Sequence, residues 1–138
     1  MLLASPSNPR ADDDGDIQVR KGDHLAAIPA HRLKLGADYM VTQAWTIGAD
    51  MVFASDQFFV GDEGNDNTKL SSYPVFNLHM SYNITKHVQV YGIINNVFDN
   101  EYATYGTYFE ADDVGLTDPR TITPAQPLYA YAGLKVKF

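Results

Sequence analysis

The sequence predicts an all-β fold, an antiparallel meander of about five long strands, from the spacing of its apolar residues and its turns. Apolar and polar side chains alternate with a period of two over five segments, which is the pattern of half-apolar strands. The connections between these segments are alternately short and long, as in a meander whose short turns share one end. No stretch shows the period of an amphipathic helix. The predicted strands cover residues 31–41, 45–54, 75–84, 87–97 and 128–138.

The long connections carry most of the negative charge. The chain has 17 Asp and Glu against 10 Lys and Arg, a net charge of −7, and 15 of the acids lie in residues 1–28, 55–73 and 99–127. These stretches are also rich in Gly, Pro and Asn, so we expect them to be loops. The acidic balance argues against nucleic acid as a partner, because phosphate binding needs clustered Lys and Arg. The absence of Cys from the sequence excludes a disulfide framework and a thiol nucleophile.

One face of the predicted sheet is apolar, with aromatic residues at both of its ends. The aromatic residues are Tyr39, Trp45, Tyr82 and Phe138 near the short turns, and Phe53 and Phe76 near the long loops. An apolar band between aromatic girdles is typical of a strand wall that crosses a membrane. Strands of about 9–11 residues also fit a tilted crossing of the bilayer.

The opposite face carries the charged residues of the strands, and we expect it to line an aqueous lumen. A Lys or Arg at mid-bilayer would cost about 2–4 kcal/mol, which gives this segregation a physical cause. Lys34 and Asp50, on neighbouring strands, are expected to pair. The residues assigned to the lumen-facing side are Arg32, Lys34, Asp38, Asp50, His79, Lys135 and Lys137.

Five strands are too few to close a barrel, since roughly eight is the smallest number that fills its interior. An open edge cannot face lipid, because its N–H and C=O groups would lack partners. The chain is therefore expected either to assemble with copies of itself or to form the end of a larger barrel, and the second is favoured. Two alternatives remain: a small autonomous or self-assembling outer-membrane β-barrel pore, and a soluble β-sheet ligand-binding domain, since soluble antiparallel sheets also alternate.

Three segments carry a resemblance to a known family. Residues 28–39 read IPAHRLKLGADY, residues 95–102 read NNVFDNEY, and residues 131–138 read YAGLKVKF. Together they resemble the C-terminal end of TonB-dependent outer-membrane receptors, with its strand entry, its NNLFDxxY segment and its terminal strand that closes on Phe. Residues 105–109 and 117–120 resemble the last external loop of that family. The resemblance covers about residues 15–138.

The resemblance implies a fold and a function. The family forms a 22-stranded transmembrane β-barrel in the outer membrane of Gram-negative bacteria, and this chain resembles its last five strands. The plug domain and the TonB-box belong to the N-terminal part, so we expect no plug domain here and contact with TonB only through that missing part. The implied function is uptake of a ferric siderophore or a similar nutrient. To it the chain would contribute barrel wall, extracellular loops and a C-terminal assembly signal.

The resemblance also implies partners. They are the outer-membrane lipid, the remainder of the receptor barrel with its plug, and the barrel-assembly machinery. Neither enzymatic activity nor a cofactor is expected, because the sequence contains no nucleophile or nucleotide-binding motif.

Two sets of residues carry specific expectations. The terminal pattern Tyr131, Gly133, Val136 and Phe138 resembles the signal read by the assembly machinery, for which strand addition would supply the backbone contacts. An ordinary last strand is its alternative. The last long loop gathers the aromatic residues Tyr102, Tyr105, Tyr108 and Phe109. These rings are expected either to face a ligand or to pack the loop against itself.

No metal site is expected. Residues 12–16 read DDDGD, but they fail the EF-hand pattern because the Gly is misplaced and residue 23 is Asp where the loop requires Glu. The four His residues show no ligand spacing. Residues 12–16 are therefore expected to form a solvated acidic loop.

Overall fold

The computed structural model describes residues 1–138, with the exception of the Asp112 side chain. The chain divides into two compact units. The loop unit consists of Met1–His31, Ser55–Ser72 and Tyr102–Ala125, and the sheet unit consists of Arg32–Ala54, Tyr73–Glu101 and Gln126–Phe138. The loop unit thus collects the long connections, and the sheet unit collects the long strands. Among the described residues, no helix has the length and apolar character needed to cross a membrane.

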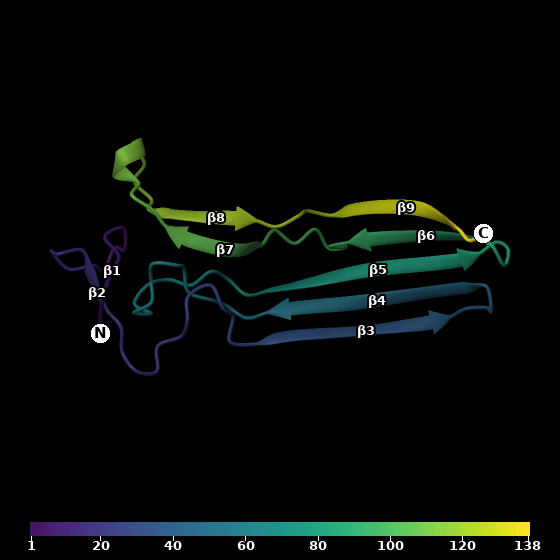
Figure 1. Cartoon of the computed structure of the whole chain (residues 1–138), viewed down its shortest axis with the longest axis horizontal. Helices are drawn as coiled ribbons and strands as arrows, with labels where there is room; N and C mark the ends of the chain where they lie inside the picture. The colour runs from purple at the N-terminus through teal and green to yellow at the C-terminus, as the bar shows by residue number, and fades with distance from the viewer. The chain divides into compact units, whose positions relative to one another are not determined.

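The sheet unit is one antiparallel sheet of five strands (Figure 1). In order across the sheet, its strands are β3 (Arg32–Met40), β4 (Trp45–Ala54), β5 (Tyr73–Asn83), β6 (Val88–Asn95) and β9 (Tyr129–Val136). The predicted all-β antiparallel fold is therefore confirmed. The alternating residues form strands because a period of two places all apolar side chains on one side of the pleat.

Both short turns are capped by threonine. Between β3 and β4, Thr42 Oγ1 accepts hydrogen bonds from the backbone N–H groups two and three residues later, at 3.2 and 3.0 Å. Between β5 and β6, Thr85 Oγ1 does the same, at 3.1 Å in both cases. A hydroxyl that bonds the backbone in this way favours a turn over continued strand. The two turns therefore end their strands by the same local chemistry.

The exposure of the two faces of the sheet is the reverse of that in a water-soluble sheet. Along β5 the apolar side chains Phe76, Leu78, Met80 and Tyr82 are exposed, whereas Val75, Asn77, His79 and Ser81 are buried or half-buried. The register extends the apolar face to the neighbouring strands, since Leu78 lies opposite Ala49 on β4 and Ile94 on β6. Further exposed residues of this face are Leu33, Leu35, Tyr39, Ile47, Leu134 and Val136.

The loop unit contains two short hairpins. The elements are β1 (Leu2–Ala4) paired with β2 (Asp16–Gln18), β7 (Ala103–Tyr108) paired with β8 (Arg120–Pro124), and the 3-10 turn η1 (Asp112–Val114). The expectation that residues 1–28 and 99–127 are wholly loops was wrong in these segments. Strands of 3 to 6 residues are too short for an alternating period to stand out from the surrounding turn residues.

A small apolar core holds the loop unit together. Phe59, Leu70 and Ala103 are buried against one another, and the half-buried Tyr108 packs at their edge. The rings of Phe59 and Tyr108 lie 5.5 Å apart, within the range of favourable aromatic pairs. The core therefore joins the connection between β4 and β5 to the hairpin of β7 and β8.

A buried carboxylate adds a polar centre to the loop unit. Asp62 is fully buried, and its oxygens accept hydrogen bonds from Asn8 Nδ2 (3.3 Å) and Asn67 Nδ2 (2.9 Å). They also accept the backbone N–H groups of Asp66 (3.2 Å) and Asn67 (3.1 Å). A buried charge is tolerated only when such donors replace its water. Asp62 thereby links the N-terminal segment, through Asn8, to the connection between β4 and β5.

Candidate functional site

The polar face of the sheet holds a His–Asp contact that spans three strands. His79 Nε2 on β5 lies 2.6 Å from Asp38 Oδ1 on β3. Gly48 of β4 lies opposite both residues in the register. A Cβ at Gly48 would collide with the Asp38 carboxylate and the His79 ring, so only glycine leaves space for the contact. Alternation places Asp38 and His79 on this face, whereas the need for glycine at position 48 follows only from the register, which the sequence does not give.

Asp50 binds a different partner from the one expected. Its carboxylate accepts a hydrogen bond from Asn77 Nδ2 at 2.7 Å, and Asn77 lies directly opposite it. Lys34 is opposite Val52, two residues along β4, and no salt bridge of the described residues joins Lys34 to Asp50. The expected pairing was therefore wrong, because the directly opposed amide is nearer than the diagonal ammonium.

The other charges assigned to the polar face follow from the register. Arg32, Lys34 and Gly36 are alternate residues of β3 and therefore share one face. Gly36 lies opposite Asp50 in the register. Lys135 lies opposite Gln89, on the same face as Gly133. Lys137 follows the end of β9, where its backbone N–H donates to His87 O at 2.8 Å. The register thus groups the three strand residues with Asp38, Asp50 and His79, and their exposure to a lumen stays a prediction.

The four residues of the expected assembly signal lie on or just after β9. Tyr131 and Gly133 are on the polar face, and Val136 lies opposite Val88 on the apolar face. The Tyr131 ring stacks on that of Tyr129, with centroids 6.4 Å apart. Phe138 lies two residues beyond the strand and is fully exposed. Their recognition by an assembly machinery stays a prediction.

The NNVFDN segment after β6 forms a tight turn around the buried Asn96. Asn96 and Asp99 adopt positive φ angles of 52° and 50°, a conformation that Asn and Asp tolerate better than most residues. Asn96 is 2% exposed, and its Nδ2 donates to Asn100 O (2.9 Å) and Gln126 O (3.2 Å). Its Oδ1 accepts the Asn100 N–H at 2.9 Å. The segment that carried much of the family resemblance therefore has a structural role that the sequence analysis did not assign.

The same turn holds the start of the last strand. Asp99 Oδ1 accepts the backbone N–H of Leu128 at 2.8 Å, and Asn100 Nδ2 donates to Pro74 O at 2.7 Å. The rings of Phe98 and Phe76 meet edge to face, 5.1 Å apart. These contacts fix β5, β6 and β9 at the end of the sheet opposite the short turns.

The four aromatic residues of the last loop do not form one cluster. Tyr105 is exposed on β7, whereas Tyr108 packs on Phe59. Tyr102 and Phe109 are half-buried and flank the hairpin, where their backbones bond Ala125 and Pro119. Burial and the nearby Asp62 carboxylate raise the pKa of Tyr108 above its usual value, so its phenol stays neutral. Tyr108 also lines a polar pocket of the loop unit.

The acidic segment of residues 12–16 is a turn. Asp12 Oδ1 accepts the backbone N–H groups of Asp14 (3.1 Å) and Asp16 (2.9 Å). Gly15 has a φ of 79°, which the turn requires. Within the part of the chain whose side chains are described, no three His, Asp or Glu groups gather in a way that would hold a metal ion.

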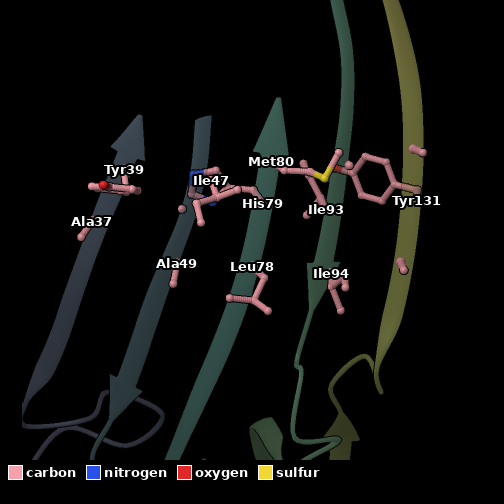
Figure 2. Close-up of a pocket in the computed structure, with 14 residues that line it drawn as sticks. Ala37, Tyr39, Ile47, Ala49, Leu78, His79, Met80, Ile93, Ile94 and Tyr131 are labelled. Carbon is pink, nitrogen blue, oxygen red and sulfur yellow. The ribbon is translucent and has the colours of Figure 1, made fainter. Parts of the chain in front are cut away.

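The apolar face is hollowed at its centre. A depression of about 790 Å³ is lined from all five strands, as Figure 2 shows. Small residues at its floor and borders create the space. They are Ala37, Ala49, Gly92, Ala130 and Ala132. Larger side chains, including Leu78 and Met80, stand between them, and the surface is almost wholly apolar.

Comparison with known proteins identifies relatives of this fold. Residues 8–97 match the family described as TonB dependent receptor-like, beta-barrel. The ferric-catecholate import receptor Fiu of E. coli, in its closed form, matches with a TM-score of 0.58 at 18% identity, over 77% of this chain and 14% of that one. The copper transporter OprC matches with a TM-score of 0.63 at 20% identity, over 83% and 18%.

A mutant of the ferric enterobactin receptor PfeA from Pseudomonas aeruginosa is also similar. It matches with a TM-score of 0.65 at 18% identity, over 80% of this chain and 17% of that one. At such identities the likeness to these three structures shows the fold alone. The chain spans 14–18% of their lengths.

Proposed function

This chain belongs to the TonB-dependent receptor-like β-barrel family, and we propose that it forms part of the wall and the external loops of an outer-membrane receptor. Members of the family are receptors and transporters, not enzymes. Because the chain spans 14–18% of the solved receptors that it matches, transport is the activity of a longer polypeptide. We assign to this chain the last five strands of the barrel.

The exposed apolar face is the observation that carries this proposal. On β5 the apolar side chains are the exposed ones, and the polar side chains are the more buried ones. Monomeric soluble proteins rarely expose a contiguous apolar surface of this extent, whereas the outer wall of a membrane barrel requires one. All charged side chains of the five strands, as described, lie on the other face. Lipid is therefore the medium that fits the apolar face.

The aromatic residues of the apolar face support an orientation. Trp45 and Tyr82 are direct register partners beside the short turns, with Tyr39 one row away. Phe53 and Phe76 lie toward the other end, where the long connections leave the sheet. Aromatic rings prefer the membrane interface, so these two groups fit its two borders. We assign the short turns to the periplasm and the long loops to the exterior, as barrels of this kind are built.

The polar face then lines the lumen, and the two sheet edges require partners. β3 and β9 each present an edge that no other strand of the sheet covers. Unpaired N–H and C=O groups in hydrocarbon cost several kcal/mol each, so strands from the rest of the receptor must continue the sheet. A 22-stranded barrel supplies those strands, and a plug from the same polypeptide fills its lumen.

The transported ligand is proposed from the kind of receptor. Two of the matched structures carry ferric-catecholate and ferric enterobactin in their names, and a third is named a copper transporter. We propose uptake of a ferric siderophore or a similar scarce nutrient, energised by TonB through the plug. The residues of this chain supply wall and loops to that process, and none is assigned a role in catalysis.

An arginine on the lipid-facing side tests the proposal. In the complete receptor, Leu78→Arg places a charge at the centre of the apolar face, and we expect a destabilisation of about 2–4 kcal/mol. The measurement is the fraction of receptor folded in the outer membrane, read from the electrophoretic mobility of unheated samples. Ser81→Arg is the matched control, because it adds the same charge to the polar face of the same strand. Equal losses in the two variants would contradict the assignment of the faces.

The terminal pattern is proposed as the assembly signal. β9 presents an uncovered backbone edge, and Phe138 is fully exposed just beyond it. Strand addition to that edge would give affinity, and the terminal ring would set the register. Deleting Phe138 from the complete receptor is expected to lower the amount of folded barrel in cells several-fold while refolding from urea into detergent is unchanged. A deletion variant that assembles at the normal level in cells would refute the signal.

A further inference from the structure

The loop unit contains a second, polar pocket that none of the preceding roles uses. It has a volume of about 420 Å³ and draws its walls from all three segments of the unit. The lining residues are Pro9, Asn67, Thr68, Tyr108, Thr117, Asp118, Pro119 and Arg120. Its lining is more polar than apolar, so hydroxyl, amide and charged groups dominate what a ligand would meet there.

One wall of the pocket is fixed from behind by buried groups. The side-chain amide of Asn67 donates to Asp62 Oδ1 (2.9 Å) and to Asn8 Oδ1 (2.8 Å). Asn8 is 4% exposed and precedes Pro9, another wall residue. Because Asp62 is fully buried and holds both asparagines, this wall is preorganised.

Another part of the lining is fixed by backbone bonds and an ion pair. Tyr108 donates its backbone N–H to Val60 O at 3.0 Å, and its ring packs on Phe59. Arg120 binds both carboxylate oxygens of Asp118, with Nε and Nη2 at 2.9 and 2.8 Å. A bidentate pair of this kind orients both groups.

The two charged side chains in the lining of the pocket, Asp118 and Arg120, form an ion pair with each other. Arg120 and Asp118 neutralise each other, and hydrogen bonds from Arg120 lower the pKa of Asp118 to about 2, so the pair persists at neutral pH. The remaining polar groups are the Tyr108 phenol, the Thr68 and Thr117 hydroxyls and the Asn67 amide. The loop unit also repels anions, because it has 13 Asp and Glu against 5 Lys and Arg, a net charge of −8.

We propose that this pocket binds a neutral, polyhydroxylated ligand of the sugar class. Neutral hydroxyls both donate and accept hydrogen bonds, as the tyrosine and threonine hydroxyls of the pocket do, whereas Asn67 offers only its amide oxygen as an acceptor. The Tyr108 ring and the two prolines supply the apolar surface against which the carbon face of a sugar packs. The inference rests on the proposed function in one respect: the loop unit must face the medium for the pocket to meet such a ligand.

Binding is tested on the complete receptor in detergent by isothermal titration. The probes are glucose, maltose and N-acetylglucosamine, with glucuronate as the anionic counterpart of glucose. We expect at least one neutral probe to bind and glucuronate to bind at least 5-fold more weakly than glucose. Failure of all neutral probes to bind, or tighter binding of glucuronate than of glucose, overturns the proposal.

Two variants locate the binding in this pocket. Tyr108→Phe removes one hydroxyl but keeps the ring that packs on Phe59, and Thr117→Val removes another with little change of shape. Loss of one hydrogen bond predicts affinity reduced about 3- to 10-fold in each. Tyr105→Phe is the matched control, since Tyr105 lies on the same strand but outside the pocket. Unchanged affinity in both pocket variants overturns the assignment.

A labelling measurement separates this inference from the proposed function. Asp14→Cys places a thiol on an exposed position of the loop unit, and the receptor without this substitution is the control for any other thiol. A membrane-impermeant maleimide is expected to label it on intact cells. Labelling without sugar binding overturns the pocket and leaves the receptor orientation intact. Sugar binding by the purified receptor without labelling on cells overturns the outward orientation and leaves the pocket intact.

Discussion

The two units of this chain are stabilised by opposite means. The sheet unit has 5 Lys and Arg against 4 Asp and Glu, a net charge of +1, and leaves its large apolar side chains exposed. The loop unit, with a net charge of −8, buries its few apolar residues around Phe59 and one carboxylate, Asp62. Backbone ladders hold the first unit, whereas a small core and side-chain hydrogen bonds hold the second. Similar hydrophobic residues are thus exposed in one unit and buried in the other.

The largest effect is expected from the polar centre of the loop unit. Asp62→Ala leaves four donor groups without their acceptor, which predicts a loss of about 3 kcal/mol or more in local stability. Limited proteolysis of the complete receptor is expected to cleave the loop unit much faster, while the barrel keeps its electrophoretic mobility. Asp66→Ala is the control, because this neighbouring carboxylate is exposed. Loss of the folded barrel in Asp62→Ala would show that the two units are not independently stabilised.

An intermediate effect is expected from a single methyl group on the polar face of the sheet. Gly48→Ala forces a Cβ into the contact between Asp38 and His79, and such overpacking costs about 1–3 kcal/mol. The urea midpoint of the refolded receptor is expected to fall, with no change in protease resistance of the loops. In Gly92→Ala the new Cβ would lie 3.6 Å from Met80 Cγ, an ordinary contact, so this variant is the control. Equal midpoints for the two variants would argue against the three-strand contact.

The smallest effect is expected from the exposed ion pair of the loop unit. The Asp118 pKa is lowered from 3.8 to about 2, first by the side-chain hydrogen bond from Arg120. A lowered carboxyl pKa means that the pair contributes fully above about pH 3.8 and is lost as the pH falls through about 2. We expect no change in the Asp118 carboxyl resonance between pH 8 and 4. Arg120→Gln is expected to move its titration back toward 3.8, and a midpoint that stays near 2 would refute the cause.

The sheet was predictable because its apolar and polar residues alternate with a period of two. Alternation over long segments predicts both the antiparallel strands and the division of Arg32, Asp38 and His79 from the apolar face. The Lys34–Asp50 pairing was wrong because alternation gives the face of a residue but not the register, which decides which residue is its direct neighbour. The register became available only with the structure.

The loop unit was much less predictable. Its strands are 3 to 6 residues long, and its contacts join segments far apart in the chain. Asp62 resembles any other acid of a Gly- and Asn-rich stretch, and its burial depends on Asn8, more than fifty positions earlier. The pocket likewise needs three segments at once, so local sequence pattern has no signal for it.

The Asn96 turn fixes both ends of the connection between β6 and β9, so the residues between these ends can change. Asn96 Nδ2 holds the carbonyls of Asn100 and Gln126, so the two ends of residues 101–125 are fixed whatever lies between them. Doubling the length of a flexible loop costs only about 0.6 kcal/mol of closure entropy. Residues 101–125 can therefore be lengthened, shortened or replaced between two anchored points without any change in the sheet.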